Sequence, residues 1–268
     1  MYKLIALDMD GTLLREDKTV SDKTKKALND ARAKGVKVVL SSGRPIEGLY
    51  KYLEELDLIK DGEYVLSYNG SLVQEVKSKN IIASKTLLGK DLKELTELSE
   101  KLGVFIHAFS KIEGLITNKI NEYTQLEADL NGIKILERSF DDIEDNEEMI
   151  KIMMIDSKEN IDKAIENLPE SVKEKYTVVR SAPVFLEFLN KESNKGTGLE
   201  ALVKHMGISR DEVIAVGDAG NDLHMIEYAG LGVAMGNAFD EVKEIANHIT
   251  KTNEEDGVEA VISKFILS

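Results

Sequence analysis

The 268-residue chain contains no cysteine. Without thiols it has no disulfide framework, no thiolate zinc or iron–sulfur site and no cysteine nucleophile, so any nucleophile must be an oxygen or a nitrogen atom. It has only three prolines, and no apolar run approaches the length of a membrane span. No basic segment with an apolar signal core precedes the first apolar run. We therefore expect a cytoplasmic, globular protein of one large or two ordinary domains, with no membrane partner.

Positive charge is also scarce. The chain has 35 Lys and Arg residues against 49 Asp and Glu residues, and its formal net charge is −14 at pH 7. Nucleic acids and anionic membranes are bound chiefly by clustered basic residues, so this balance argues against both kinds of partner. If the substrate is an anion, a divalent cation and a few local basic side chains must reverse the sign of the field inside the site.

What the chain does have is an apolar run, residues 4–7, that leads directly into Asp8, Asp10 and Gly11. A short unbroken apolar run is typical of a parallel strand that is buried on both faces. Ligands of open α/β sheets bind at the carboxyl ends of such strands, where a glycine lets the backbone turn. The same residues also fit a solvated turn or an arm of a calcium loop, although the apolar Leu13 and Leu14 stand where a calcium loop needs oxygen ligands.

The pattern of an apolar strand followed by a polar loop recurs three times along the chain. Residues 36–40 lead to Ser42 and Gly43, residues 64–67 lead to Asn69, and residues 213–216 lead to a loop that holds Asp218, Asn221 and Asp222. Helical patterns lie between the strands. This alternation predicts an α/β fold with a doubly wound, mostly parallel sheet.

The pattern changes between residues 84 and 186, where strand-like runs come in pairs with helices between them. Two successive runs that only Ala182 and Pro183 separate must be antiparallel neighbours, and so must the two runs on either side of a short turn at Gly114. We therefore predict a core domain made of residues 1–83 and 187–268, and an inserted α+β domain of residues 84–186.

The polar loops of the core domain predict one site, because the carboxyl ends of parallel strands meet at one edge of a sheet. A cluster of carboxylates at that edge needs a hard cation, and a set of oxygen ligands without His or Cys favours Mg²⁺. Lys195, at the start of a predicted helix, supplies a further positive charge. The hydroxyl of Ser42 and nearby backbone N–H groups are suitable donors to a phosphate. Together these groups favour phosphoryl transfer, with Asp8 as a natural nucleophile.

Four motifs, in order along the chain, resemble those of the haloacid dehalogenase (HAD) superfamily. They are residues 8–12, residues 42–44, residues 194–196 and residues 217–222. Over its whole length the chain is similar to the Cof-type phosphatases of that superfamily, and closely so to a bacterial sugar phosphatase. The resemblance implies a Rossmann-like HAD core sheet, and it makes the insert a C2-type cap, which closes over the core, excludes water and carries substrate selectivity.

The resemblance also implies a role for the motif residues. Asp8 would attack phosphorus to form an aspartyl-phosphate, and Asp10 would protonate the leaving oxygen and then deprotonate the hydrolytic water. Mg²⁺ would be held by Asp8, the backbone carbonyl of Asp10 and Asp218. Asp222 would not coordinate the metal directly but would orient the metal ligands and the bound waters. Lys195 would neutralise Asp8 and the phosphoryl oxygens.

Further residues are expected to contact phosphate or substrate. Ser42, Gly43 and Asn221 would bind phosphate or orient Lys195. Arg44, Asn69 and His107 are additional candidates, although Asn69 followed by glycine is also typical of a plain turn.

The activity that we expect is the Mg²⁺-dependent removal of phosphate from small phosphorylated sugars, by a monomer or a homodimer. Two alternatives stay open at this point. A phosphomutase would pass phosphate between sugar hydroxyls, and a sugar-phosphate sensor would bind without turnover.

Overall fold

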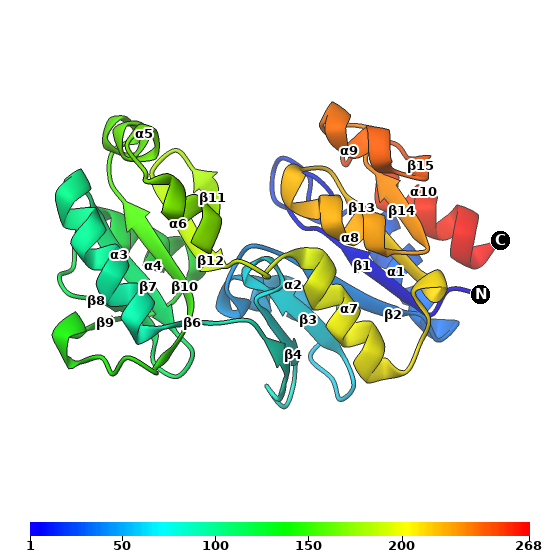
Figure 1. Cartoon of the computed structure of the whole chain (residues 1–268). Helices are drawn as coiled ribbons and strands as arrows, with labels where there is room; N and C mark the ends of the chain where they lie inside the picture. Colours follow the sequence, from blue (N-terminus) through cyan, green and yellow to red (C-terminus); the bar gives the residue numbers. More distant parts are fainter. The chain divides into compact units, whose positions relative to one another are not determined.

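The computed structural model describes all residues from 1 to 268 (Figure 1). The chain divides into two compact units. The first unit contains residues 1–43, 51–83 and 194–268, and the second contains residues 44–50 and 84–193.

The first unit is built on an eight-stranded sheet with the order β15-β14-β13-β1-β2-β3-β4-β5. Its strands are β1 (Leu4–Leu7), β2 (Lys37–Ser41), β3 (Tyr64–Ser67), β4 (Leu72–Glu75), β5 (Ile81–Ser84), β13 (Val213–Gly217), β14 (Leu231–Ala234) and β15 (His248–Ile249). The strands from β15 to β3 are parallel to their neighbours, and β4 turns back antiparallel to β3. This confirms the predicted doubly wound, mostly parallel sheet.

The sheet is held by buried apolar strands and by capped helices. All four residues of β1 are 0% exposed, as expected for a strand that is covered on both faces. The helices are α1 (Asp22–Ala33), α2 (Tyr50–Glu55), α7 (Lys195–Met206), α8 (Leu223–Tyr228), α9 (Asp240–Ile245) and α10 (Gly257–Ile262). Ser21 begins α1 by accepting a hydrogen bond from the N–H of Thr24, as an N-cap should. Helix α1 packs against β2 and α10, whereas α7 packs against α8, β3 and β4.

The second unit has its own sheet, with the order β11-β12-β10-β7-β8-β9 and with β6 paired to β10. Its strands are β6 (Leu87–Leu88), β7 (Phe105–Ser110), β8 (Gly114–Thr117), β9 (Ile135–Glu137), β10 (Glu148–Ile155), β11 (Tyr176–Ala182) and β12 (Phe185–Asn190). The β7–β8 and β11–β12 hairpins are antiparallel, which confirms the prediction from their short turns. Only β8 and β9 are parallel neighbours.

Helices α3 (Gly89–Leu102), α4 (Glu122–Asn131), α5 (Lys158–Glu166) and α6 (Glu170–Lys175) complete the second unit. Residues of α3, α5 and α6 form an apolar cluster with one set of strand side chains, including Ile106, Met154 and Phe188. This arrangement is the predicted inserted α+β fold.

The limits of the two units differ from those expected from sequence at two places. Strand β12 pairs with β10 and β11 over Phe185–Asn190, so the second unit extends to residue 193 rather than ending at 186. Residues 44–50 also group with the second unit, because their short helix η1 (Ile46–Leu49) packs against α4. In neither unit does any helix have the length and apolar character needed to cross a membrane.

Candidate active site

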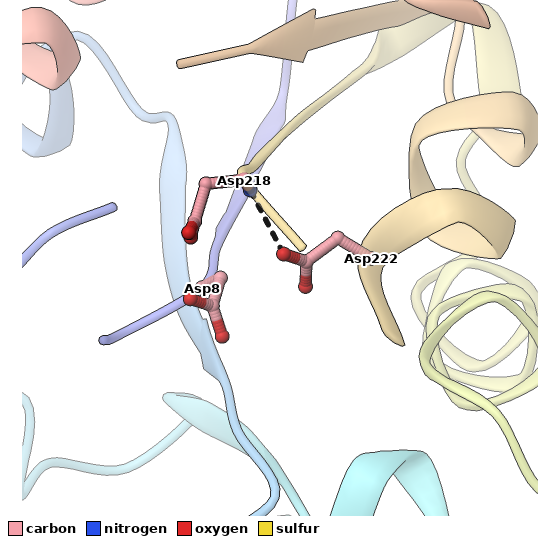
Figure 2. A group of neighbouring side chains, drawn as sticks. All are labelled: Asp8, Asp218 and Asp222. Carbon is pink, nitrogen blue, oxygen red and sulfur yellow. Dashed lines mark hydrogen bonds between the residues drawn. The ribbon is translucent and has the colours of Figure 1, made fainter. Parts of the chain in front are cut away.

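Three carboxylates meet at the carboxyl edge of the parallel sheet in the first unit. Asp8 directly follows β1, Asp218 directly follows β13, and Asp222 ends the short helix η5 (Gly220–Asp222). One oxygen from each carboxylate lies within 4.8 Å of the others. Figure 2 shows the three side chains close together, with Asp8 from the segment after β1 and with Asp218 and Asp222 from the segment after β13. The topology brings them together because β1 and β13 are adjacent parallel strands whose loops leave the sheet on the same side.

Two glycines make room for this cluster. Gly11 has a φ of +87°, and a Cβ atom there would lie 2.4 Å from Oδ2 of Asp218. A Cβ atom on Gly217 would lie 2.4 Å from Cβ of Asp222. Neither position accepts a side chain without moving a carboxylate, so both glycines are needed for close approach.

Lys195 places its ammonium group among the carboxylates. It is the first residue of α7 and is 0% exposed, and its Nζ lies 2.5 Å from Oδ1 of Asp8 and 2.6 Å from Oδ1 of Asp222. The side chain of Asn194 caps the helix by accepting from the N–H of Thr197. The capped first turn therefore fixes the direction in which Lys195 leaves the helix.

Asp222 is held in turn by the backbone of its own loop. Its Oδ2 accepts hydrogen bonds from the N–H groups of Asp218, 2.9 Å away, and Ala219, 3.0 Å away. The first of these bonds is the dashed line in Figure 2. Its other oxygen faces Lys195, so both oxygens of Asp222 have fixed partners.

The protonation properties of the cluster follow from burial and from like charges. Burial and the neighbouring Asp222 raise the pKa of Asp8 well above its ordinary value, although Lys195 opposes the rise. Burial raises the pKa of Asp218 as well, with Asp222 adding to the effect and Thr12 opposing it. Burial alone would lower the pKa of Lys195, but Asp222 and Asp8 outweigh it and raise that pKa, so the ammonium stays charged.

This cluster fits a divalent metal ion. Three carboxylates around one ammonium carry an excess of negative charge when all are ionised, and the charge of Asp222 adds to the rise that burial causes in the pKa values of Asp8 and Asp218. All the ligand atoms that they offer are oxygens, which suits Mg²⁺. Asp218 is also oriented by Thr12, whose hydroxyl donates to Oδ1 at 2.8 Å. Thr12 belongs to the first of the four motifs, but its position in the sequence does not predict this contact.

The loops after β2 and β3 lie against the loop after β13. The backbone N–H of Asn69 donates to the carbonyl of Ser42 at 2.9 Å, and its side-chain Oδ1 accepts from Nδ2 of Asn221 at 3.0 Å. Asn69 adopts a left-handed φ of 55° and is 6% exposed. Asn69 therefore links the loop after β2, which holds Ser42, to the loop after β13, which holds Asn221. Both of these residues are predicted to bind phosphate or to orient Lys195. A Cβ atom on Gly43 would stand 3.1 Å from the Asn69 amide, which shows how closely these segments approach.

Asp10 lies outside the carboxylate cluster. Its Oδ1 accepts a hydrogen bond from Nζ of Lys18 at 2.7 Å, on the loop between β1 and α1. Its side chain is 41% exposed, compared with 9% for Asp8. The structure therefore places Asp8 as the enclosed carboxylate and Asp10 as the accessible one.

Arg44 and His107 belong to the second unit, so their roles toward a substrate stay predictions. His107 is 0% exposed and lies between Thr124, 3.3 Å from Nδ1, and Met153, whose sulfur is 3.2 Å from Nε2. Burial, with the nearby Lys151 ammonium, lowers the pKa of His107 to about 3. The ring is therefore neutral at pH 7.

The fold and this site define a phosphatase of the HAD type. A family model described as haloacid dehalogenase-like hydrolase matches residues 5–262, and the chain belongs to that family. The fold is the HAD core sheet with an inserted α+β cap of the C2 type, and the sequence places the chain among the Cof-type phosphatases.

Three relatives illustrate the similarity. YxeH of Bacillus subtilis, by its name a candidate phosphatase, is 44% identical over 269 residues, and the match covers 100% of both chains. The 5-amino-6-(5-phospho-D-ribitylamino)uracil phosphatase YitU of the same organism is 33% identical, with 98% of this chain and 97% of YitU covered. The solved structure of BT4131, described as a subclass IIB sugar phosphatase, is 26% identical with a TM-score of 0.78 and covers 98% of each chain.

Proposed function

We propose that this protein hydrolyses phosphate monoesters of small sugars and related polyhydroxylated molecules, with Asp8 as the nucleophile. The observation that carries the proposal is the buried contact of Lys195 with both Asp8 and Asp222 at the carboxyl edge of the sheet. This contact presents one oxygen of an enclosed carboxylate next to a fixed positive charge. A phosphoryl group that enters the site would meet both together.

The reaction would take place in two halves. In the first, Asp8 forms a bond to phosphorus while the bond from phosphorus to the sugar oxygen breaks, and Asp10 gives that oxygen a proton. In the second, Asp10 takes a proton from water as the water attacks phosphorus, which releases inorganic phosphate and restores Asp8. The accessible position of Asp10 suits these two proton transfers, because leaving group and water reach it from solvent.

The remaining residues of the site would hold charge and orientation. Lys195 would stabilise negative charge on the phosphoryl oxygens, and Asp222 would keep the ammonium in place. Mg²⁺, held by Asp8, Asp218 and the backbone carbonyl of Asp10, would neutralise charge and orient the phosphoryl group. Ser42, Gly43 and Asn221 would donate to the phosphate, with Asn69 joining their loops.

The substrate class draws support from what the relatives are named for. BT4131 is described as a sugar phosphatase, and the name of YitU specifies a phosphate on a ribityl chain. Both names describe phosphate esters of polyhydroxylated carbon chains. The same chemistry is proposed here, with sugar phosphates as the first class to be tested.

The test is release of inorganic phosphate from a panel of sugar phosphates and ribitylamino-pyrimidine phosphates, with Mg²⁺ and with EDTA. We expect the native protein to release phosphate only with Mg²⁺ and Asp8→Asn to release none. Asp22→Asn, at an exposed position in the first turn of α1, is the matched control and should behave like the native protein.

Three results would contradict the proposal. Release that Asp8→Asn does not diminish would remove Asp8 as nucleophile. Conversion of one sugar phosphate to an isomer without phosphate release would favour a mutase. If the protein binds sugar phosphates tightly but neither turns them over nor traps aluminium fluoride, a sensor would be favoured.

A further inference from the structure

The carboxylate of Asp10 has a basic partner to which the sequence patterns gave no role. Nζ of Lys18 lies 2.7 Å from Oδ1 of Asp10. Lys18 lies on the loop between β1 and α1, eight residues beyond Asp10. Nothing in its sequence context distinguishes it from other surface lysines, and its side chain is 55% exposed.

The backbone of Lys18 is nevertheless held from several sides. Lys18 has a left-handed φ of 63°, and its N–H donates to the carbonyl of Arg15 at 3.0 Å. Its own carbonyl accepts from the hydroxyl of Tyr52 at 3.4 Å. The next residue, Thr19, donates through both its N–H and its hydroxyl to the carboxylate of Asp17. A left-handed lysine costs free energy that these contacts must offset, so the position of its Cα is specified.

The rest of the loop is tied to the C-terminal part of the first unit. A guanidinium nitrogen of Arg15 lies 2.8 Å from Asp256, and the side chain of Asn253 donates to the carbonyl of Leu14 at 2.9 Å. The side chain of Asn237 donates to the carbonyl of Gly11 at 2.8 Å. The loop is therefore anchored over residues 11–15, on the N-terminal side of Lys18.

We propose that Lys18 is a positioning residue that orients the carboxylate of Asp10 for proton transfer. The inference rests on the proposed function, because it assumes that Asp10 is the general acid and base. An exposed ion pair contributes little to stability, but a charge-assisted hydrogen bond is directional and selects one orientation of the carboxylate. Its value therefore lies in placing Asp10 rather than in holding the loop.

The test compares two leaving groups in Lys18→Gln. A sugar alkoxide must be protonated as it leaves, whereas p-nitrophenolate leaves without a proton, so only the first reaction depends on a well-placed general acid. The value of kcat/KM reports steps up to departure of the first leaving group and excludes hydrolysis of the aspartyl-phosphate. We expect kcat/KM for the best sugar phosphate to fall about five- to tenfold and that for p-nitrophenyl phosphate to change less than about twofold.

The controls separate this role from a structural one and from failure of the proposed function. Lys18→Arg should restore most of the sugar phosphate activity, and Lys26→Gln, which removes an exposed lysine paired with Asp30, should change neither substrate. An equal fall for both substrates, or no fall for either, would overturn the role of Lys18 while leaving the phosphatase intact. If the native protein releases phosphate from neither substrate, the proposed function fails first and this inference fails with it.

Discussion

A buried ion cluster in the second unit gives a sharp prediction about stability. Nζ of Lys151 lies 2.9 Å from Oε1 of Glu187 and 3.5 Å from Oε1 of Glu127, and all three residues are at most 5% exposed. Oε2 of Glu187 is buried and has no hydrogen-bond partner. Burial raises the pKa of Glu127, Lys151 opposes that rise and Glu187 adds to it. Replacing Lys151 by Met leaves two buried carboxyls without their cation.

The size of the effect follows from the proton that the variant must take up. An unpaired buried carboxylate becomes neutral rather than remaining charged, and the cost is that of protonating an ordinary glutamate at the working pH. With an unfolded-state pKa of about 4.3, one proton costs about 3.7 kcal/mol at pH 7 and about 1 kcal/mol at pH 5. Because Glu127 and Glu187 contact the same ammonium, they are close enough to share one proton once it is removed. The folded variant then holds one proton more than the unfolded chain, so its free energy of unfolding decreases as the pH rises from 5 to 7.

The assay is urea unfolding at pH 5 and pH 7, combined with hydrogen exchange of the β10 and β12 amides to isolate the second unit. Lys151→Met should lose about 3 to 4 kcal/mol relative to the native protein at pH 7 and about 1 kcal/mol at pH 5. Adding both Glu127→Gln and Glu187→Gln should recover most of the loss, because no buried carboxyl is then left to take up a proton. Lys158→Met, at an exposed lysine paired with Asp162, is the matched control and should change stability by less than about 0.5 kcal/mol. A loss in Lys151→Met that is the same at both pH values would refute the argument from proton uptake.

Two further changes test the site itself. Lys195→Met leaves Asp8 and Asp222 without their ammonium, and we expect Mg²⁺-dependent phosphate release to fall by about 10³-fold. A variant that kept its native rate would show that Lys195 does not stabilise the reacting group. Gly11→Ala would place a Cβ atom 2.4 Å from Oδ2 of Asp218, and we expect the Mg²⁺ concentration for half-activation to rise about 10- to 100-fold. Gly35→Ala has a similar φ of +85° but no atom within 4 Å of the new Cβ, so activation should be unchanged. Equal effects of the two glycine variants would mean that backbone strain, and not displacement of Asp218, weakens the metal site.

Local pattern predicted the first unit well. Strands β1, β2, β3 and β13 are short apolar runs that end in polar loops, and parallel pairing alone is enough to bring those loops together. The proximity of Asp8 and Asp218 follows from this topology, whereas Lys195 reaches them from the first turn of α7. The topology does not predict the hydrogen bonds from Thr12 to Asp218 and from Asn221 to Asn69. These bonds depend on the directions of the side chains, which the spacing of residues in the sequence does not determine.

Other features of the structure could not be predicted from any local sequence pattern. The ion cluster of Lys151, Glu187 and Glu127 joins two strands and a helix, and the pattern around each residue is only that of a strand or helix with one charged position. Strand β15 is two residues long, too short for alternation to show. The grouping of residues 44–50 with the second unit depends on packing of η1 against α4, which no property of the segment itself predicts.

The most direct test of the account is to find the phosphoryl group on the protein. The Asp10→Asn variant should load from p-nitrophenyl phosphate, which needs no general acid, and then lose the phosphoryl group slowly because no base activates water. Acid quenching followed by peptide mapping should locate the phosphoryl group on Asp8, and only when Mg²⁺ was present. Release of p-nitrophenol by native protein, with no covalent phosphoryl group in the variant or with one on another residue, would contradict the mechanism.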